Sequence, residues 1–430
     1  MKLPHMAIIE QQFDSQMIDD VEAAVIRQIS ELNLGDRVSE GDTVAVTAGS
    51  RGIAHIDIIT RAVVHELKKL GTYPFIFPAM GSHGGATAEG QVKVLAGLGI
   101  TEEFVGCPIK SDMEPAYLGM AAADYPIYVD RNAMAADHIV LVNRVKAHTK
   151  FKGAVESGLM KMMAIGMGKQ KGASYYHKAA VRLTFQKIVE SVGVEVMKRC
   201  PVLFGLAVVE NAFHEPCVIK AFKPDTLLEG EIELLKISKQ RMARLPFEEI
   251  DVLIVDQIGK DISGIGMDPN VTGRNYDLLG DFTTRPRVKR VFARDLTDKS
   301  DGNANGIGLA DFTTTRLVDK IDRPKTWMNA ITGISPEKGA VPIHFDTDEE
   351  VLAACFETIG DTPSEQARVV HIQNTMDVQH ISVSKAYADE IASNSKLKRL
   401  TDWKEMEIDS AGNITACCSL FSNADREFSR

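Results

Sequence analysis

Long apolar stretches and paired cysteines are both scarce in this sequence. No uncharged run in its 430 residues approaches the roughly 18 to 20 apolar residues of a membrane-spanning helix. The six cysteines are scattered and include no Cys-x-x-Cys pair, which disfavours a disulfide framework or a cysteine zinc site. The start of the chain combines a short apolar run with acids and glutamines, unlike a secretory signal. We therefore expect a cytoplasmic protein without a membrane segment.

A basic excess is also missing. Lys and Arg number 49 against 59 Asp and Glu, which gives a net charge of −10. This balance does not favour nucleic acid or an anionic membrane as a partner. The hydrophobic fraction of 44% and the charged fraction of 25% are typical of folded globular chains. Because the length exceeds that of one ordinary domain, we expect two domains, each with a sizeable core.

A complete dinucleotide-binding pattern is absent as well. Gly264 and Gly266 follow a predicted strand over Asp251–Asp256, but the third glycine is missing at the required spacing. We expect no helix to open directly after them. A Rossmann NAD site is therefore disfavoured.

What the sequence does contain is a repeated motif of strand, glycine-rich turn and helix. The first copy runs from a strand over Thr43–Thr47 to a helix over Ile53–Leu70 and carries Ser50 and Arg51 in its turn. The N-terminal amides of a helix bind anions, and an arginine offers a charged fork for carboxylate or phosphate. Arg51 is thus either an anion ligand or a surface arginine beside a helix start.

The second copy of the motif ends in a histidine. A strand over Tyr73–Ala79 leads into a turn where His83 stands between Ser82 and Gly84. With nothing bulky beside it, His83 is a candidate for an acid/base or metal role. A structural histidine is the other interpretation.

The segment Asn143–Lys178 concentrates the most unusual side chains. It follows the apolar run His138–Val142, which is typical of a buried parallel strand, so it starts at the edge where open α/β sheets bind ligands. It holds His148, His177, seven lysines and four methionines. A solvated loop does not need the methionines, and a core helix does not tolerate the lysines. The segment therefore predicts a ligand site, and we expect a helix after it over Ala179–Lys198.

A composition break at Pro246 separates two α/β regions. We predict a domain over residues 1–245 for cofactor binding and catalysis, and a domain over residues 246–430 that completes the substrate cleft. The alternation of strands and helices favours mostly parallel sheets in both, with the active site in the cleft between them. In the second domain Lys260, which follows the strand Asp251–Asp256, is the candidate for contact with substrate.

Five features together resemble the nickel-dependent lactate racemase family: Arg51, Gly81-Ser82-His83, His148, Ser157-Gly158-x-x-Lys161 and His177. His177 lies sixteen residues after Lys161, as the nickel ligand does in that family. The sequence departs from the family at Ala48, where an aspartate is usual, and in a longer interval between His148 and Lys161. The resemblance covers the first half of the chain, and the second half matches only in its α/β character.

The resemblance implies a covalently bound nickel-pincer nucleotide, pyridinium-3-thioamide-5-thiocarboxylic acid mononucleotide. Lys161 would hold it through a thioamide, and His177 would ligate the nickel. His83 and His148 would be the two acid/base groups. Further implied cofactor contacts are Ser50, Gly158 and Arg51.

The implied reaction is the inversion of C2 in a 2-hydroxy acid by reversible hydride transfer, as in a racemase or epimerase. Two histidines are needed because the two enantiomers present their hydroxyl groups to opposite sides. Arg51 would hold the substrate carboxylate or the cofactor phosphate. Lactate, malate, aryl-lactates and sugar acids all carry the carboxylate and the 2-hydroxyl group that this reaction needs. The resemblance therefore implies the class of 2-hydroxy acids and no single substrate.

Two other functions compete with this one. A divalent-metal hydrolase or lyase would use His83, His148 and His177 as ligands, which is a recognised zinc set, but it would leave Lys161 without a role. A non-catalytic binder of an anionic metabolite would use the lysines and Arg51 as a basic pocket. Such a binder has little use for two acid/base histidines.

Overall fold

The computed structural model describes residues 1–50, 52–121, 125–279, 282–283 and 285–415. The described chain divides into two compact units, which we call the first unit (Asp14–Met242) and the second unit (Met1–Phe13 together with residues 243–415). The predicted domain over residues 1–245 differs from this division at its start. The physical reason is that β1 (His5–Gln11) pairs with β16 (His380–Ser384), a strand of the second unit.

The first unit is built on a five-stranded sheet in the order β3-β2-β6-β7-β8. Four of the strands are parallel, and β8 runs antiparallel to β7. The strands are β2 (Thr43–Ala48), β3 (Tyr73–Pro78), β6 (His138–Arg144), β7 (Val202–Glu210) and β8 (Pro216–Phe222). Apolar residues dominate β7, and it is buried along its whole length, as expected for a strand covered on both faces.

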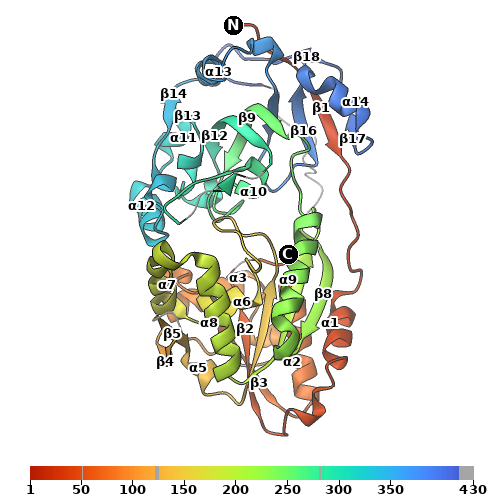
Figure 1. Ribbon diagram of the computed structural model, residues 1–430, viewed down its shortest axis with the longest axis vertical. Helices are drawn as coiled ribbons and strands as arrows, with labels where there is room; N and C mark the ends of the chain where they lie inside the picture. Colours follow the sequence, from red (N-terminus) through yellow and green to blue (C-terminus); the bar gives the residue numbers. More distant parts are fainter. Residues whose placement is uncertain (51, 122–124, 280–281, 284, 416–430) are drawn as a thin grey trace. The chain divides into compact units, whose positions relative to one another are not determined.

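Helices cover both faces of this sheet (Figure 1). Alternate residues of β7 show the two layers: Phe204 and Leu206 pack in a core cluster with α1 and α2, whereas the Cα of Gly205 faces Leu159 of α6 and Leu227 of α9. The helices are α1 (Val21–Ser30), α2 (Ile56–Lys69), α3 (Ala88–Gly97), α4 (Glu102–Val105), α5 (Arg131–Met134), α6 (Leu159–Lys161), α7 (Lys169–Leu183), α8 (Phe185–Arg199) and α9 (Pro224–Arg241).

Two further elements of the first unit pack against α7. A π-helix, η3 (Met162–Gly166), continues directly from α6 toward α7. A separate antiparallel pair, β4 (Pro115–Met120) and β5 (Pro126–Asp130), packs against α7. π-Helical turns are rare and occur frequently at functional sites.

The second unit contains a nine-stranded sheet in the order β14-β13-β12-β9-β15-β16-β1-β17, with β18 also paired to β1. The strands from β14 to β15 are parallel, and β16 reverses the direction. Its strands besides β1 and β16 are β9 (Glu249–Ile258), β12 (Arg287–Leu296), β13 (Phe312–Thr314), β14 (Ile343–Phe345), β15 (Val369–Ile372), β17 (Leu397–Arg399) and β18 (Lys404–Glu405).

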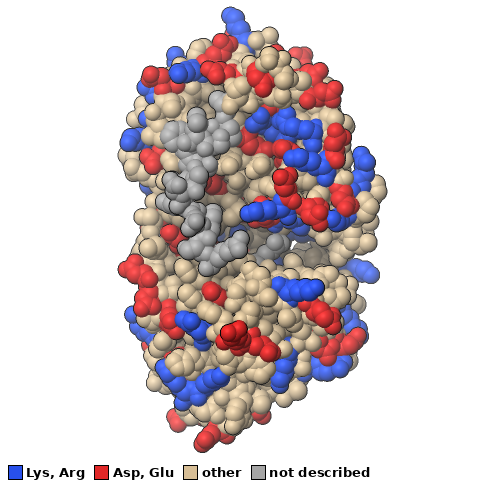
Figure 2. Space-filling model, turned by 180° about the vertical axis from the view of Figure 1, so that it is seen from behind, with Lys and Arg blue, Asp and Glu red and all other residues tan. Residues whose placement is uncertain are grey.

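Short helices and one small ribbon complete the second unit. They are α10 (Pro269–Thr272), α11 (Thr315–Asp319), α12 (Arg323–Thr332), α13 (Asp348–Glu357), α14 (Ala388–Ser393) and the pair β10 (Arg274–Asn275) and β11 (Phe282–Thr283). The prediction of an α/β protein with mostly parallel sheets is confirmed. The expectation that no helix follows Gly264 and Gly266 is wrong, because Asp268 caps the start of α10 by accepting the backbone N–H of Asn270. Within the described ranges, no helix is long and apolar enough to cross a bilayer. Acidic and basic side chains are interspersed over the face drawn in Figure 2.

Candidate functional site

Three strand ends of the first unit meet at one edge of its sheet. The strands β3, β2 and β6 are parallel neighbours, so the residues that follow them emerge on the same side. There a cavity of about 140 Å³ opens. Its described lining consists of Met80, Gly81, Ser82, His83, His148, Lys150, Phe151, Lys161, Ile165, Ala173, His177 and Phe185. The structure thus brings together His83, His148, Lys161 and His177, four of the residues that the sequence singles out.

The other predicted site residues do not line this cavity in the described part of the chain. Ser50 follows β2, and Gly158 precedes the helix that carries Lys161. Arg51 lies outside the described residues. Lys260 belongs to the second unit, where its Nζ donates to the carbonyl oxygen of Gly264 at 2.7 Å and to Oδ1 of Asn329 at 2.6 Å.

His83 is held by its own turn. Its Nδ1 lies 2.8 Å from the carbonyl oxygen of Met80. A carbonyl oxygen only accepts, so Nδ1 carries a hydrogen, and in the neutral ring the lone pair is on Nε2. The buried Gln91 steadies the same turn by donating from Nε2 to the carbonyl oxygen of Gly81 at 3.0 Å. At Gly84, where φ is +65°, a Cβ would come within 2.5 Å of the backbone of Gly90, so only glycine fits.

His148 is held in the opposite way. Its Nδ1 accepts a hydrogen bond from the backbone N–H of Lys150 at 3.0 Å, so in the neutral ring the hydrogen is on Nε2. Its own backbone N–H donates to the fully buried Glu156 at 2.6 Å. Burial first, and then the positive charges of Lys161 and other nearby lysines, lower the pKa of His148 well below its usual value. His148 is therefore neutral at pH 7.

An aromatic cluster joins the two sides of the cavity. The ring centroid of Phe185 lies 4.9 Å from that of His177, 5.1 Å from that of Phe151 and 6.5 Å from that of His148. Phe185 begins α8 because Thr184, at φ 69° and ψ 144°, separates this helix from α7. Such a backbone is rare for a β-branched residue and costs of order 1–3 kcal/mol. The expected continuous helix over Ala179–Lys198 is therefore wrong at this point.

Three charged residues that support the site were not singled out from the sequence. Glu156 accepts the backbone N–H of His148, Lys169 starts α7, and Glu231 lies against the start of α6. The signal for Glu231 was present, since it lies four residues after Leu227 and four before Leu235 on the buried face of α9. The signal for Lys169 was hidden among the seven lysines of its segment.

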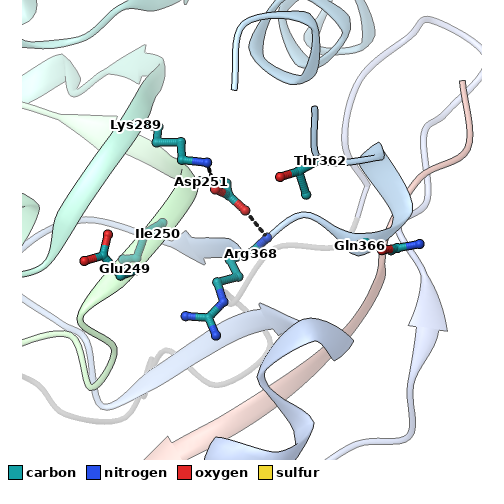
Figure 3. Close-up of a pocket in the computed structure, with 7 residues that line it drawn as sticks. All are labelled: Glu249, Ile250, Asp251, Lys289, Thr362, Gln366 and Arg368. Carbon is teal, nitrogen blue, oxygen red and sulfur yellow. Dashed lines mark hydrogen bonds and ion pairs between the residues drawn. The ribbon is translucent and has the colours of Figure 1, made fainter. Parts of the chain in front are cut away.

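A larger cavity, of about 340 Å³, lies in the second unit (Figure 3). It opens at the N-terminal ends of β9, β12 and β15, opposite the edge where parallel sheets bind ligands. Its charges satisfy one another: Asp251 lies 2.7 Å from Nζ of Lys289 and accepts the backbone N–H of Arg368 at 2.8 Å. The cavity of the first unit is therefore the better candidate for chemistry.

The three-histidine hydrolase and the nickel-pincer racemase require different sets of metal ligands. Among the residues that the structure describes, no group of three or more His, Cys, Asp or Glu side chains could hold a metal ion. His83, His148 and His177 line one cavity without forming such a group, so the geometry does not support a three-histidine hydrolase site. The nickel-pincer nucleotide needs only one imidazole and one lysine amine from the protein. His177 and Lys161 line the same cavity and fit that donor set.

Comparison with known proteins gives one match at the level of domains. Residues 5–186 match the lactate racemase N-terminal domain family. This range contains His83, His148, Lys161 and His177. No curated protein matches the chain.

Two solved structures are similar at low sequence identity. The lactate racemase apoprotein from Thermoanaerobacterium thermosaccharolyticum is 12% identical, with a TM-score of 0.46, over 86% of this chain and 89% of that one. A Thermotoga maritima protein from a structural genomics programme is 13% identical, also with a TM-score of 0.46, over 74% of this chain and 81% of that one. We take no functional conclusion from these two similarities. The domain match shows that residues 5–186, which hold the four residues of the cavity, are similar to the lactate racemase N-terminal domain.

Proposed function

We propose that the protein is an isomerase, a racemase or epimerase that inverts C2 of a 2-hydroxy acid. One observation carries the proposal: His83, His148, Lys161 and His177 line a single cavity within the range that matches the lactate racemase N-terminal domain. A non-catalytic binder of anions gives no reason for these histidines to meet beside Lys161.

The cofactor we propose is a nickel-pincer nucleotide, held covalently by Lys161 and ligated through nickel by His177. When bound, it would supply a hydride acceptor and donor for C2 of the substrate. The aromatic rings of Phe151 and Phe185 support His148 and His177 and keep water from this side of the cavity.

The two remaining histidines handle the hydroxyl proton. His83 presents the Nε2 lone pair and is suited to accept the proton of the substrate hydroxyl. His148 presents an Nε2 hydrogen and is suited to donate to the oxygen atom. To accept a proton at Nε2, His148 must first change its tautomer, which breaks the hydrogen bond from the N–H of Lys150. We therefore propose that the two histidines start each cycle in different states.

The charges around the cavity favour an anionic substrate. Lys150 and Lys161 line it, and Lys150 keeps its charge after Lys161 becomes a thioamide. Arg51 is proposed as a further ligand of the carboxylate. The class of substrate is a small 2-hydroxy acid.

Isotope retention tests this function. Protein produced together with the cofactor-biosynthesis enzymes is first checked by intact mass for an adduct, and by metal analysis for nickel. It is then incubated with a panel of 2-hydroxy acids that carry deuterium at C2. We expect inversion with the deuterium retained, since the hydrogen stays on the cofactor. Exchange of the deuterium with water during turnover would instead indicate a two-base proton-transfer racemase.

A further inference from the structure

The helix that carries Lys161 begins against a buried carboxylate. Glu231, on α9, is fully buried, and its Oε2 accepts the backbone N–H of Met160 at 2.9 Å. The backbone N–H of Leu159 also faces this carboxylate, since its interaction with Glu231 lowers the pKa of the carboxyl group. These are two of the N–H groups that the first turn of a helix leaves without a partner inside the helix. An N-cap side chain usually accepts a hydrogen bond from these N–H groups, and it comes from the residue just before the helix. Here the acceptor is Glu231, which comes from a different helix.

Gly158 makes room for this carboxylate. A Cβ on Gly158 would lie 2.2 Å from Oε1 and 2.5 Å from Cδ of Glu231. The φ of Gly158 is 174°, an extended backbone that any residue adopts, so the contact and not the backbone requires a glycine. Within the described chain, the buried Oε1 of Glu231 has no hydrogen-bond partner, so the carboxylate keeps its place through Oε2 and through packing.

The side chains of Leu159 and Met160 also pack closely against α8 and β7. A Cβ on Gly193 of α8 would lie 2.6 Å from Cε of Met160, and a Cβ on Gly205 of β7 would lie 2.7 Å from Cδ1 of Leu159. The side chains of Leu159 and Met160 thus fill the space that two glycines leave open. With its backbone amides bound and its side chains enclosed, the segment has little freedom to rotate, and the direction in which Lys161 leaves it is fixed.

We propose that Glu231 is a positioning residue which, through the amides of Leu159 and Met160 and the missing side chain of Gly158, directs Lys161 into the cavity. The inference rests on the proposed function for what Lys161 does there. It also gives Gly158 a role of its own: space for Glu231, in place of the cofactor contact that the family resemblance implies.

Two variants of Glu231 separate positioning from general stability. Glu231→Leu keeps the volume but removes the acceptor, whereas Glu231→Gln keeps an acceptor oxygen. Hydrogen exchange at the amides of Leu159 and Met160 and the fraction of Lys161 with cofactor mass are measured in both. We expect Glu231→Leu to lower protection and loading by about tenfold or more, and Glu231→Gln to restore most of both. As a matched control, Leu234→Ala on the same helix should lower the unfolding temperature and leave loading unchanged.

A double-mutant cycle tests the partnership with Gly158 directly. If Gly158 serves Glu231, Gly158→Ala should lower amide protection and Lys161 loading by itself, and should change little further in a Glu231→Ala background. Equal losses in both backgrounds would assign Gly158 to the cofactor and overturn the inference. Unchanged amide protection in Glu231→Leu would overturn it as well. If the unaltered protein took up no cofactor, the proposed function would fail, while the amide measurements would still decide the role of Glu231.

Discussion

Nζ of Lys169 lies 2.7 Å from Oδ2 of Asp130, and both side chains are fully buried. Lys169 also donates to the carbonyl oxygen of Pro78 at 2.6 Å. Pro78 ends β3, whose turn holds His83, and Lys169 starts α7, which carries His177. The hydrogen bond from Lys169 to Pro78 therefore connects the two elements that place these histidines at the cavity, and Asp130 balances the buried charge of Lys169.

Removal of the lysine should destabilise the first unit strongly. Lys169→Met leaves the carboxylate of Asp130 buried without its cation, which typically costs about 3–5 kcal/mol. Urea unfolding measures this loss. Lys178→Met, at an exposed position of the same helix, is the control and should change the free energy of unfolding by less than about 0.5 kcal/mol. Addition of Asp130→Asn to Lys169→Met should recover part of the loss. Equal stability of the two lysine variants would show that the buried pair contributes nothing.

Glu231 should give the protein an unusual pH dependence. Burial, opposed by hydrogen bonds from Met160 and Leu159, raises the pKa of Glu231 from 4.5 to about 7. The folded protein thus keeps a proton that the unfolded chain releases near pH 4.5, so the stabilisation from this group is complete below pH 4.5 and is lost as pH rises through 7. Compared with Glu231→Gln, the unaltered protein should lose about 3 kcal/mol of unfolding free energy across this window. A constant difference between the two at all pH values would contradict the raised pKa.

The placement of the histidines could be predicted from the sequence because it depends on local patterns. The apolar runs that became β2, β3 and β6 were recognisable, and parallel order alone brings their C-terminal ends to one edge. The turn with His83 and the segment with His148 follow two of these strands directly. Because both segments follow parallel strands that flank β2, His83 and His148 reach the same cavity.

The features that the sequence did not reveal depend on long-range contacts. The pairing of Ile9 in β1 with Ile381 in β16 joins residues from opposite ends of the chain, and no local pattern specifies it. The break at Thr184 interrupts a continuous helical pattern, and Phe185 directly after it contacts Phe151 and His177, which are distant in the sequence. The methionines of the central segment contributed to the prediction of a ligand site, but Met160 and Met163 are fully buried and are absent from the described lining of the cavity. Core packing explains them.

Lys161 and His177 should fail in different ways when they are replaced. Lys161→Arg keeps the positive charge but loses the primary amine that forms a thioamide, so intact mass should show no adduct. Because the charge is retained, the pKa of His148 should stay low, and its NMR titration is the control for a correct fold. His177→Ala should keep the proposed adduct on Lys161 and lower the ratio of nickel to protein, since a proposed ligand of the metal is lost. Full turnover by Lys161→Arg would exclude covalent attachment at this residue.

The two acid/base histidines should be distinguishable in the resting protein before any substrate is added. The carbonyl oxygen of Met80 requires a hydrogen on Nδ1 of His83, and the N–H of Lys150 requires a lone pair on Nδ1 of His148. Nitrogen-15 NMR of labelled histidine at neutral pH reports each tautomer directly, and His83→Gln and His148→Gln assign the signals. We expect the Nδ1–H form for His83 and the Nε2–H form for His148, with His148 still neutral well below pH 6.5. If both rings showed the same tautomer, the two histidines would be equivalent at rest, and the division of roles between proton acceptor and hydrogen-bond donor would have to be abandoned.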